Sequence, residues 1–111
     1  MNAAEATLAL ETAPTETVCR EAHTLIFAAP YIGVIRTGVG EGMALLRKAR
    51  PAAAIDYHFY PQGWVDPIIN PPLPRQADRH SFSIRENGSI WRGTSSNPFA
   101  AALAALLKAA P

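Results

Sequence analysis

One stretch constrains the fold of this chain more than any other. It is residues 82–93, Phe-Ser-Ile-Arg-Glu-Asn-Gly-Ser-Ile-Trp-Arg-Gly. Asn87-Gly88 is the preferred dipeptide of a two-residue type I′ turn, and β-forming residues flank it on both sides. Because the turn fixes the pairing, Arg85 should face Ile90 and Ile84 should face Trp91. The sequence therefore predicts an antiparallel β-hairpin.

The two faces of this hairpin differ in chemistry. One face carries the large apolar side chains of Phe82, Ile84 and Trp91, and it should pack on the core. The opposite face, in contact with water, consists of Ser83, Arg85, Ile90 and Arg92. The hairpin is therefore expected to present guanidinium groups to the outside.

Residue patterns predict the other elements outward from the hairpin. Before it come a helix from Thr15 to Pro30, a strand at 31–36, a helix at 41–50 and a strand at 55–60. After it, Asn97 and a proline at the first helical position begin a C-terminal helix. The sequence predicts an α+β fold, with a three- to four-stranded, mainly antiparallel sheet packed by about three helices.

The chain is long enough for one domain and too short for two. Residues 15–111 are expected to form this single α+β domain, and residues 61–80 are expected to form a stiff proline-rich loop within it. Residues 1–14, rich in alanine, threonine and glutamate and ending at Pro14, are expected to be a mobile leader.

Charge is distributed unevenly along the chain. Residues 1–21 contain four glutamates and one arginine, a net charge of −3, whereas the remaining ninety residues carry nine basic and five acidic side chains, a net charge of +4. The acidic leader could lie on its own body, the body could bind an acidic partner, or the charges could be ordinary solvated groups. The sequence leaves these three readings open.

No set of residues fixes a catalytic chemistry. Cys19 and His23 are four residues apart on a predicted helix, and with His58 or His80 they could form a metal site or a thiolate pair. His58 and His80 each lie in a different element, and nothing in their spacing brings them to this helix. Gly38–Gly42 resembles a phosphate-binding loop, but a glutamate inside it opposes an anion. We therefore expect a protein without enzymatic activity, cofactor or metal.

Composition narrows the setting. A single cysteine fits a reducing compartment, and the overall charge of +1 is too small for a general nucleic-acid coat protein. The longest apolar stretch, residues 25–35, is interrupted by Pro30 and Gly33 and is too short to cross a bilayer. These features predict a cytoplasmic protein with no membrane contact.

Six side chains are candidates for contact with a partner. Exposed tyrosine and tryptophan side chains are common anchors at interfaces, and arginines gather around the hairpin. The candidate partner-binding residues are Tyr60, Trp64, Arg75, Arg79, Arg85 and Arg92. Together they predict a protein partner with an acidic surface, and nucleic acid is the alternative partner.

The C-terminal helix offers a second candidate surface. Its apolar stripe consists of Phe99, Leu103, Leu106, Leu107 and Ala110, and nearly all its other residues are alanine. An uncharged alanine face allows close approach of another helix, which predicts a homodimer through this helix. The alternative is an ordinary exposed alanine face, or one packed within the domain.

The run from Phe82 to Arg92, followed by Ser96 to Leu107, resembles the tail of small phage and prophage α–β–α sandwich proteins. The shared pattern is a strand, a turn, a strand with a tryptophan, a polar linker with proline, and an Ala/Leu helix. The resemblance covers about a quarter of the chain and transfers no catalytic residue. It implies a phage-associated accessory protein that contacts another macromolecule.

Three functions follow from these observations. The first is a small non-catalytic binding or inhibitory module, encoded by a phage, that acts by contact with a host macromolecule. The second is a nucleic-acid-binding regulator that uses the basic hairpin face. The third is a small enzyme or metal protein that uses the cysteine and histidines.

Overall fold

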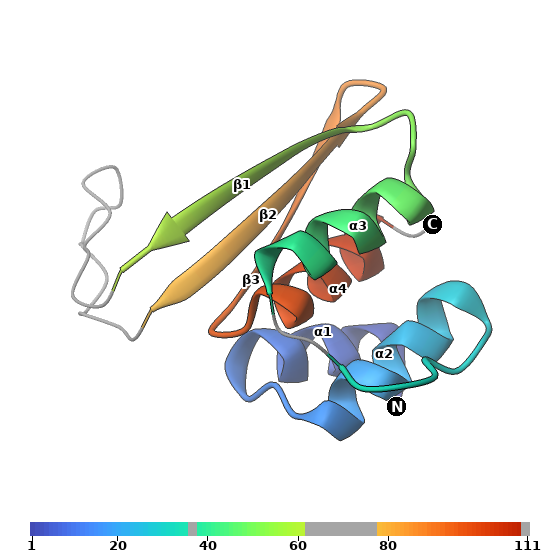
Figure 1. The fold of residues 1–111 in the computed structure, drawn as a ribbon. Coiled ribbons are helices and arrows are strands. Elements are labelled where there is room, and N and C mark those ends of the chain that lie inside the picture. Colours follow the sequence, from blue (N-terminus) through green and yellow to red (C-terminus); the bar gives the residue numbers. More distant parts are fainter. Residues whose placement is uncertain (36–37, 62–77, 110–111) are drawn as a thin grey trace.

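Four helices and a three-stranded antiparallel sheet make up this computed structural model, which describes residues 1–35, 38–61 and 78–109. The strands lie in the order β1-β2-β3, so the predicted α+β class is confirmed (Figure 1). The elements are α1 (Ala3–Thr12), α2 (Glu16–Phe27), α3 (Val39–Ala49), β1 (Ala54–Tyr60), β2 (Arg79–Glu86), β3 (Ser89–Ser95) and α4 (Pro98–Ala109).

The hairpin of β2 and β3 has the pairing that its turn predicts. Arg85 faces Ile90 and Ile84 faces Trp91. Asn87 and Gly88 both have positive φ, 52° and 80°, as the two central residues of a type I′ turn require. The local sequence is therefore sufficient to set this register.

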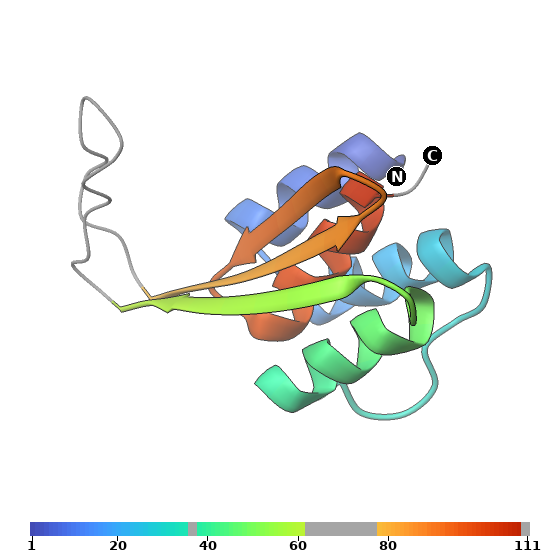
Figure 2. The same ribbon diagram turned by 90° about the horizontal axis from the view of Figure 1, so that it is seen from above.

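All four helices lie on one side of the sheet, as Figures 1 and 2 show. Helix α4 contacts β2 and β3 directly, and α1, α2 and α3 in turn pack on α4. No described helix covers the opposite side, which we name the open face. Its residues, by strand alternation and register, are Ala54, Asp56, His58, Tyr60, Arg79, Ser81, Ser83, Arg85, Ile90, Arg92 and Thr94.

Helix α4 forms the centre of the core. Every residue from Pro98 to Leu107 is buried, and Lys108 is exposed. A side-chain carbon at Gly93 of β3 would overlap the backbone of Ala101 and Ala105, so the helix lies directly on the strand there. The predicted homodimer through the alanine face is therefore wrong: small side chains let α4 approach a strand and three helices of its own chain.

Residues 1–14 do not form the expected mobile leader, because α1 occupies most of them. Asn2 and Glu5 form a capping box at its beginning, and Ala6 and Leu10 are fully buried. At its end, the Ser95 hydroxyl donates to the Leu10 carbonyl at 2.7 Å. Composition did not reveal this helix, because α1 packs largely on α4, at the other end of the sequence.

Glu11 attaches α1 to the outer edge of β3. Its Oε2 accepts hydrogen bonds from the Thr94 N–H and from Lys108 Nζ, both at 3.0 Å. Lys108 Nζ also donates to the Arg92 carbonyl at 2.7 Å. Of the three readings of the charge asymmetry, the acidic segment lying on its own body is the one the structure supports at this residue.

The predicted strand at 31–36 is absent from the described residues 31–35, which are irregular. Arg20 explains the difference, because its guanidinium donates to the carbonyls of Tyr31 and Gly33, each at 2.7 Å. Gly33 also has a φ of +103°, which interrupts an extended strand.

In the described ranges, no helix has both the length and the apolar character needed to cross a membrane.

Candidate functional site

The open face is the candidate partner site, since it gathers polar side chains from all three strands. Alternation along β1, β2 and β3 places one side chain in every two on this face. Of the predicted partner-binding residues, four lie on it: Tyr60, Arg79, Arg85 and Arg92. The other two, Trp64 and Arg75, lie outside the described residues, as does most of the 61–80 loop.

Arg79 is already engaged by its own chain. Its guanidinium donates to the Glu11 carbonyl at 2.9 Å and to Thr94 Oγ1 at 3.0 Å. Those two bonds connect β2 to α1 and β3, and the side chain is half-buried. Arg79 therefore helps to hold the face together, a role that its position in the sequence did not reveal.

Arg85 and Arg92 are the exposed guanidinium groups of the open face. Arg85 lies 3.0 Å from the carboxylate of Asp56, with 54% of its side chain accessible. A pair this exposed contributes about 0–1 kcal/mol, so a partner can exchange it at little cost. Arg92 donates from Nε to Ser83 Oγ at 3.2 Å, and its two terminal nitrogens have no partner in the described part of the chain.

Ser81 is a polar group of this face that the sequence did not single out. It lies in the central strand between His58 and Thr94, and it is fully buried. Among the described residues its hydroxyl has no hydrogen-bond partner. A buried hydroxyl without a hydrogen-bond partner lowers the stability of the fold by about 1–3 kcal/mol. Ser81 is therefore a position where the hydrogen bonding of this face is incomplete within the described residues.

The cysteine and histidines do not converge. Cys19 and His23 are buried in α2, and the ring of His23 packs against Phe27 and Tyr31. His58 lies on the open face and His80 on the helix-covered face. Across residues 1–35, 38–61 and 78–109, no group of three or more His, Cys, Asp or Glu could hold a metal ion.

Cys19 is expected to be unreactive in the folded protein. Burial, with a smaller contribution from Glu16, raises the pKa of its thiol to about 11, so the nucleophilic thiolate is scarce near neutral pH. We expect a thiol reagent at pH 8 to modify Cys19 only as fast as the chain opens, and to react immediately in denaturant. Rapid modification of the native protein would contradict this placement.

His80 has a specific partner on the covered face. Its Nδ1 lies 2.6 Å from the hydroxyl of Tyr57. Burial lowers the pKa of His80, against a smaller opposing effect of Asp78, and burial also raises the pKa of Tyr57. Both shifts favour the neutral forms, so this contact is a neutral hydrogen bond that joins β1 to β2.

The glycines of residues 38–42 have structural roles instead of forming a phosphate loop. Gly38 is the N-cap of α3, and the Glu41 carboxylate lies against it, where an anion would have to sit. Gly42 leaves little room for a side chain, since an added carbon would lie 3.0 Å from the ring of Phe82. The sequence favoured this structural reading, and the contacts support it.

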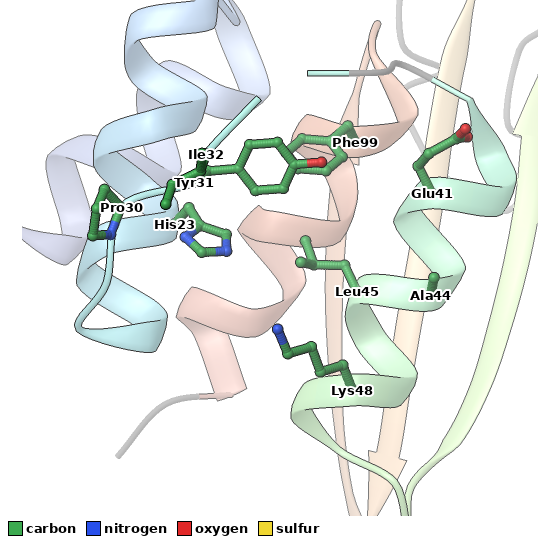
Figure 3. Close-up of a pocket in the computed structure, with 9 residues that line it drawn as sticks. All are labelled: His23, Pro30, Tyr31, Ile32, Glu41, Ala44, Leu45, Lys48 and Phe99. Atoms are coloured by element: carbon green, nitrogen blue, oxygen red, sulfur yellow. The ribbon is translucent and has the colours of Figure 1, made fainter. Parts of the chain in front are cut away.

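A pocket of about 410 Å³ lies on the helical side, between the 30–32 segment and α3. Figure 3 shows Tyr31 and His23 pointing toward α3, with the ring of Tyr31 beside that of Phe99 of α4. Its lining has no serine, threonine or cysteine, and its charged groups are one carboxylate and one ammonium. Ile32 at its rim is 89% exposed. The apolar run at 25–35 was the available signal for this surface, but the sequence predicted the end of a helix and a strand there instead of an exposed apolar segment.

Comparison with protein-family models, with curated proteins and with solved structures finds no match for this chain.

Proposed function

We propose that this protein is a non-catalytic binding module whose open face contacts an acidic surface of a partner protein. The observation that carries the proposal is a three-stranded face that no described helix covers and that exposes Arg85 and Arg92. On the other side of the sheet, by contrast, the side chains of β2 and β3 pack under α4. A basic sheet face that no described helix covers is a surface suited to recognition.

The bonding of the arginines favours a protein over a nucleic acid. Affinity for nucleic acid comes largely from many phosphate contacts made by lysine and arginine. Arg79 is used internally. Arg85 and Arg92 are left as the exposed guanidinium groups of the open face, and each makes one contact within the described part of the chain. So few exposed guanidinium groups suit a small number of specific carboxylate contacts better than the many contacts of a phosphate backbone. We therefore rank nucleic acid second.

The inhibitory and phage-encoded roles belong to this proposal as expectations from the resemblance of the C-terminal quarter. A cytoplasmic setting belongs to it as well, and a buried Cys19 thiol is compatible with such a reducing compartment. The proposed partner is therefore a host macromolecule with clustered Asp and Glu side chains. The enzyme alternative has no support from Cys19, since its thiol is buried and its pKa is raised.

Reversing the two exposed charges is expected to weaken partner capture. The Arg85→Glu/Arg92→Glu variant should lose affinity at least about tenfold for a protein captured from a bacterial lysate, because like charges then face each other. Arg47→Glu is the matched control, since Arg47 is exposed on α3 on the helical side. Binding is measured by isothermal titration with the purified partner, and folding by circular dichroism.

Equal loss in the control, or no loss in the double variant, would remove the open face from the proposal. The ionic-strength dependence separates the two partner classes. A steep linear fall of log affinity with log salt is the behaviour of phosphate contacts, and a shallow one that of a protein interface.

A further inference from the structure

The two edge strands of the sheet differ in whether described residues hydrogen-bond to their outward backbone groups. At the β3 edge, the Thr94 N–H and the Arg92 carbonyl are bonded to Glu11 and Lys108. At the β1 edge, no described residue bonds to an outward backbone group of Ile55, Tyr57 or Phe59. Figures 1 and 2 show β1 as an edge strand of the sheet, with α3 on the helix side as the element that contacts it. An unprotected edge strand is a template for another strand.

Hydrogen-bond parity shows which groups β1 offers. In an antiparallel sheet, the N–H and C=O of one residue point to the same side, and this side alternates along the strand. Because Thr94 points outward from β3, its partner Ser81 must point toward β1 and bond to His58. Ile55, Tyr57 and Phe59 then present their N–H and C=O groups outward. Such a row can accept a complete new strand.

We propose that the β1 edge binds the β1 edge of a second copy of this chain, antiparallel, with the two-fold axis at Tyr57. Tyr57 then pairs with itself, and Ile55 pairs with Phe59 of the other copy. All seven residues of β1 take part. The two three-stranded sheets become one sheet of six strands, with the helices of both copies on the same side. This inference does not depend on the proposed function.

Charge complementarity on the open face selects this register. With Tyr57 on the axis, Asp56 of each copy faces His58 of the other in a pair whose Cα atoms are about 4.5 Å apart. The imidazole N–H can donate to the carboxylate across the interface. Shifting the pairing by two residues in one direction would place Asp56 opposite Asp56, which like charges disfavour. The sequence of this edge is therefore complementary to itself in one register.

The covered face supplies the apolar part of the contact. Phe59 is 47% exposed although it lies in a strand among the large apolar side chains of the helix side. In the proposed pairing it lies opposite Ile55 of the second copy, and such aromatic and β-branched cross-strand pairs stabilise sheets. The pairing also joins the two open faces, so the dimer presents Arg85 and Arg92 twice on one surface.

A cross-linking experiment tests the register directly. Asp56→Cys and His58→Cys are made as separate single variants, mixed and oxidised mildly. The native Cys19 is buried and does not compete. The predicted pair has a Cα separation of about 4.5 Å, within the range for a disulfide. We expect the mixture to form a disulfide-linked heterodimer, and each variant alone to form little linked dimer.

Efficient linking of either variant alone, or no linking of the mixture, would overturn the register.

Sedimentation equilibrium tests the edge itself. Phe59→Lys should shift the full-length chain from dimer to monomer, since an edge lysine opposes strand pairing. Ile90→Lys, at a 64% exposed site on the opposite edge strand, should leave the dimer mass unchanged. A monomeric unmodified chain at micromolar to millimolar concentration would overturn the whole proposal.

Discussion

Gly93→Ala is expected to lower the free energy of unfolding by about 3 kcal/mol. The added carbon would overlap the backbone of α4 at Ala101 and Ala105. A flexible side chain could rotate away from it, but a helix backbone cannot, so α4 must move off β3 and lose packing with its neighbours. Because a domain of this size is stable by about 5–15 kcal/mol in total, a large part of its stability is at risk. Chemical denaturation monitored by circular dichroism measures the change.

Gly40→Ala is the matched control for this substitution. Gly40 lies in α3, where nothing lies within 4 Å of an added side-chain carbon. Alanine is the better helix former, so this change should stabilise the protein by about 0.5–1 kcal/mol. If both variants behaved alike, α4 would not lie directly on β3 as described here.

Leu10→Ala is expected to lower the free energy of unfolding by about 3 kcal/mol, within the usual range for a buried leucine. Leu10 is fully buried in the core although it lies within the first 14 residues. Its loss leaves a cavity at the contact of α1 with the rest of the domain. A mobile leader would predict no change, so this variant discriminates between the two descriptions. Urea denaturation at equilibrium measures it.

Leu8→Ala is the internal comparison for α1. Leu8 is 65% exposed on the same helix and undergoes the same chemical change. We expect an effect within about 0.5 kcal/mol, since the side chain is already largely in water. Equal, small effects at both positions would mean that α1 does not pack on the domain.

The sequence predicted the chemistry of the candidate site better than its bonding. Strand alternation correctly placed Arg85 and Arg92 on the outer face, because side chains in a strand point to opposite sides in turn. It gave no reason to expect that Arg79 bonds to the Glu11 carbonyl, because 68 residues separate them. The unpaired Ser81 hydroxyl was equally hidden, since a serine in a strand carries no mark of its surroundings.

The exposed apolar surface beside the pocket escaped prediction for a related reason. A run such as residues 31–35 has strong β propensity, and a strand there would have buried alternate side chains. In the structure, Ile32 and Val34 are 89% and 79% exposed. Local preference was overridden by Arg20, whose guanidinium binds the carbonyls that a neighbouring strand would have needed.

By itself, the sequence determined the features that depend on a few adjacent residues. Asn87-Gly88 determines the hairpin because both residues tolerate positive φ. Asn97 begins α4 because its side chain accepts hydrogen bonds from the free N–H groups of Phe99 and Ala100. The tertiary structure was needed to show that α1 is packed, that the alanine face of α4 is internal, and that no described residue bonds to the outer backbone groups of β1. Those outcomes depend on which distant surfaces meet, and burial of apolar area is not directional, so no local pattern encodes them.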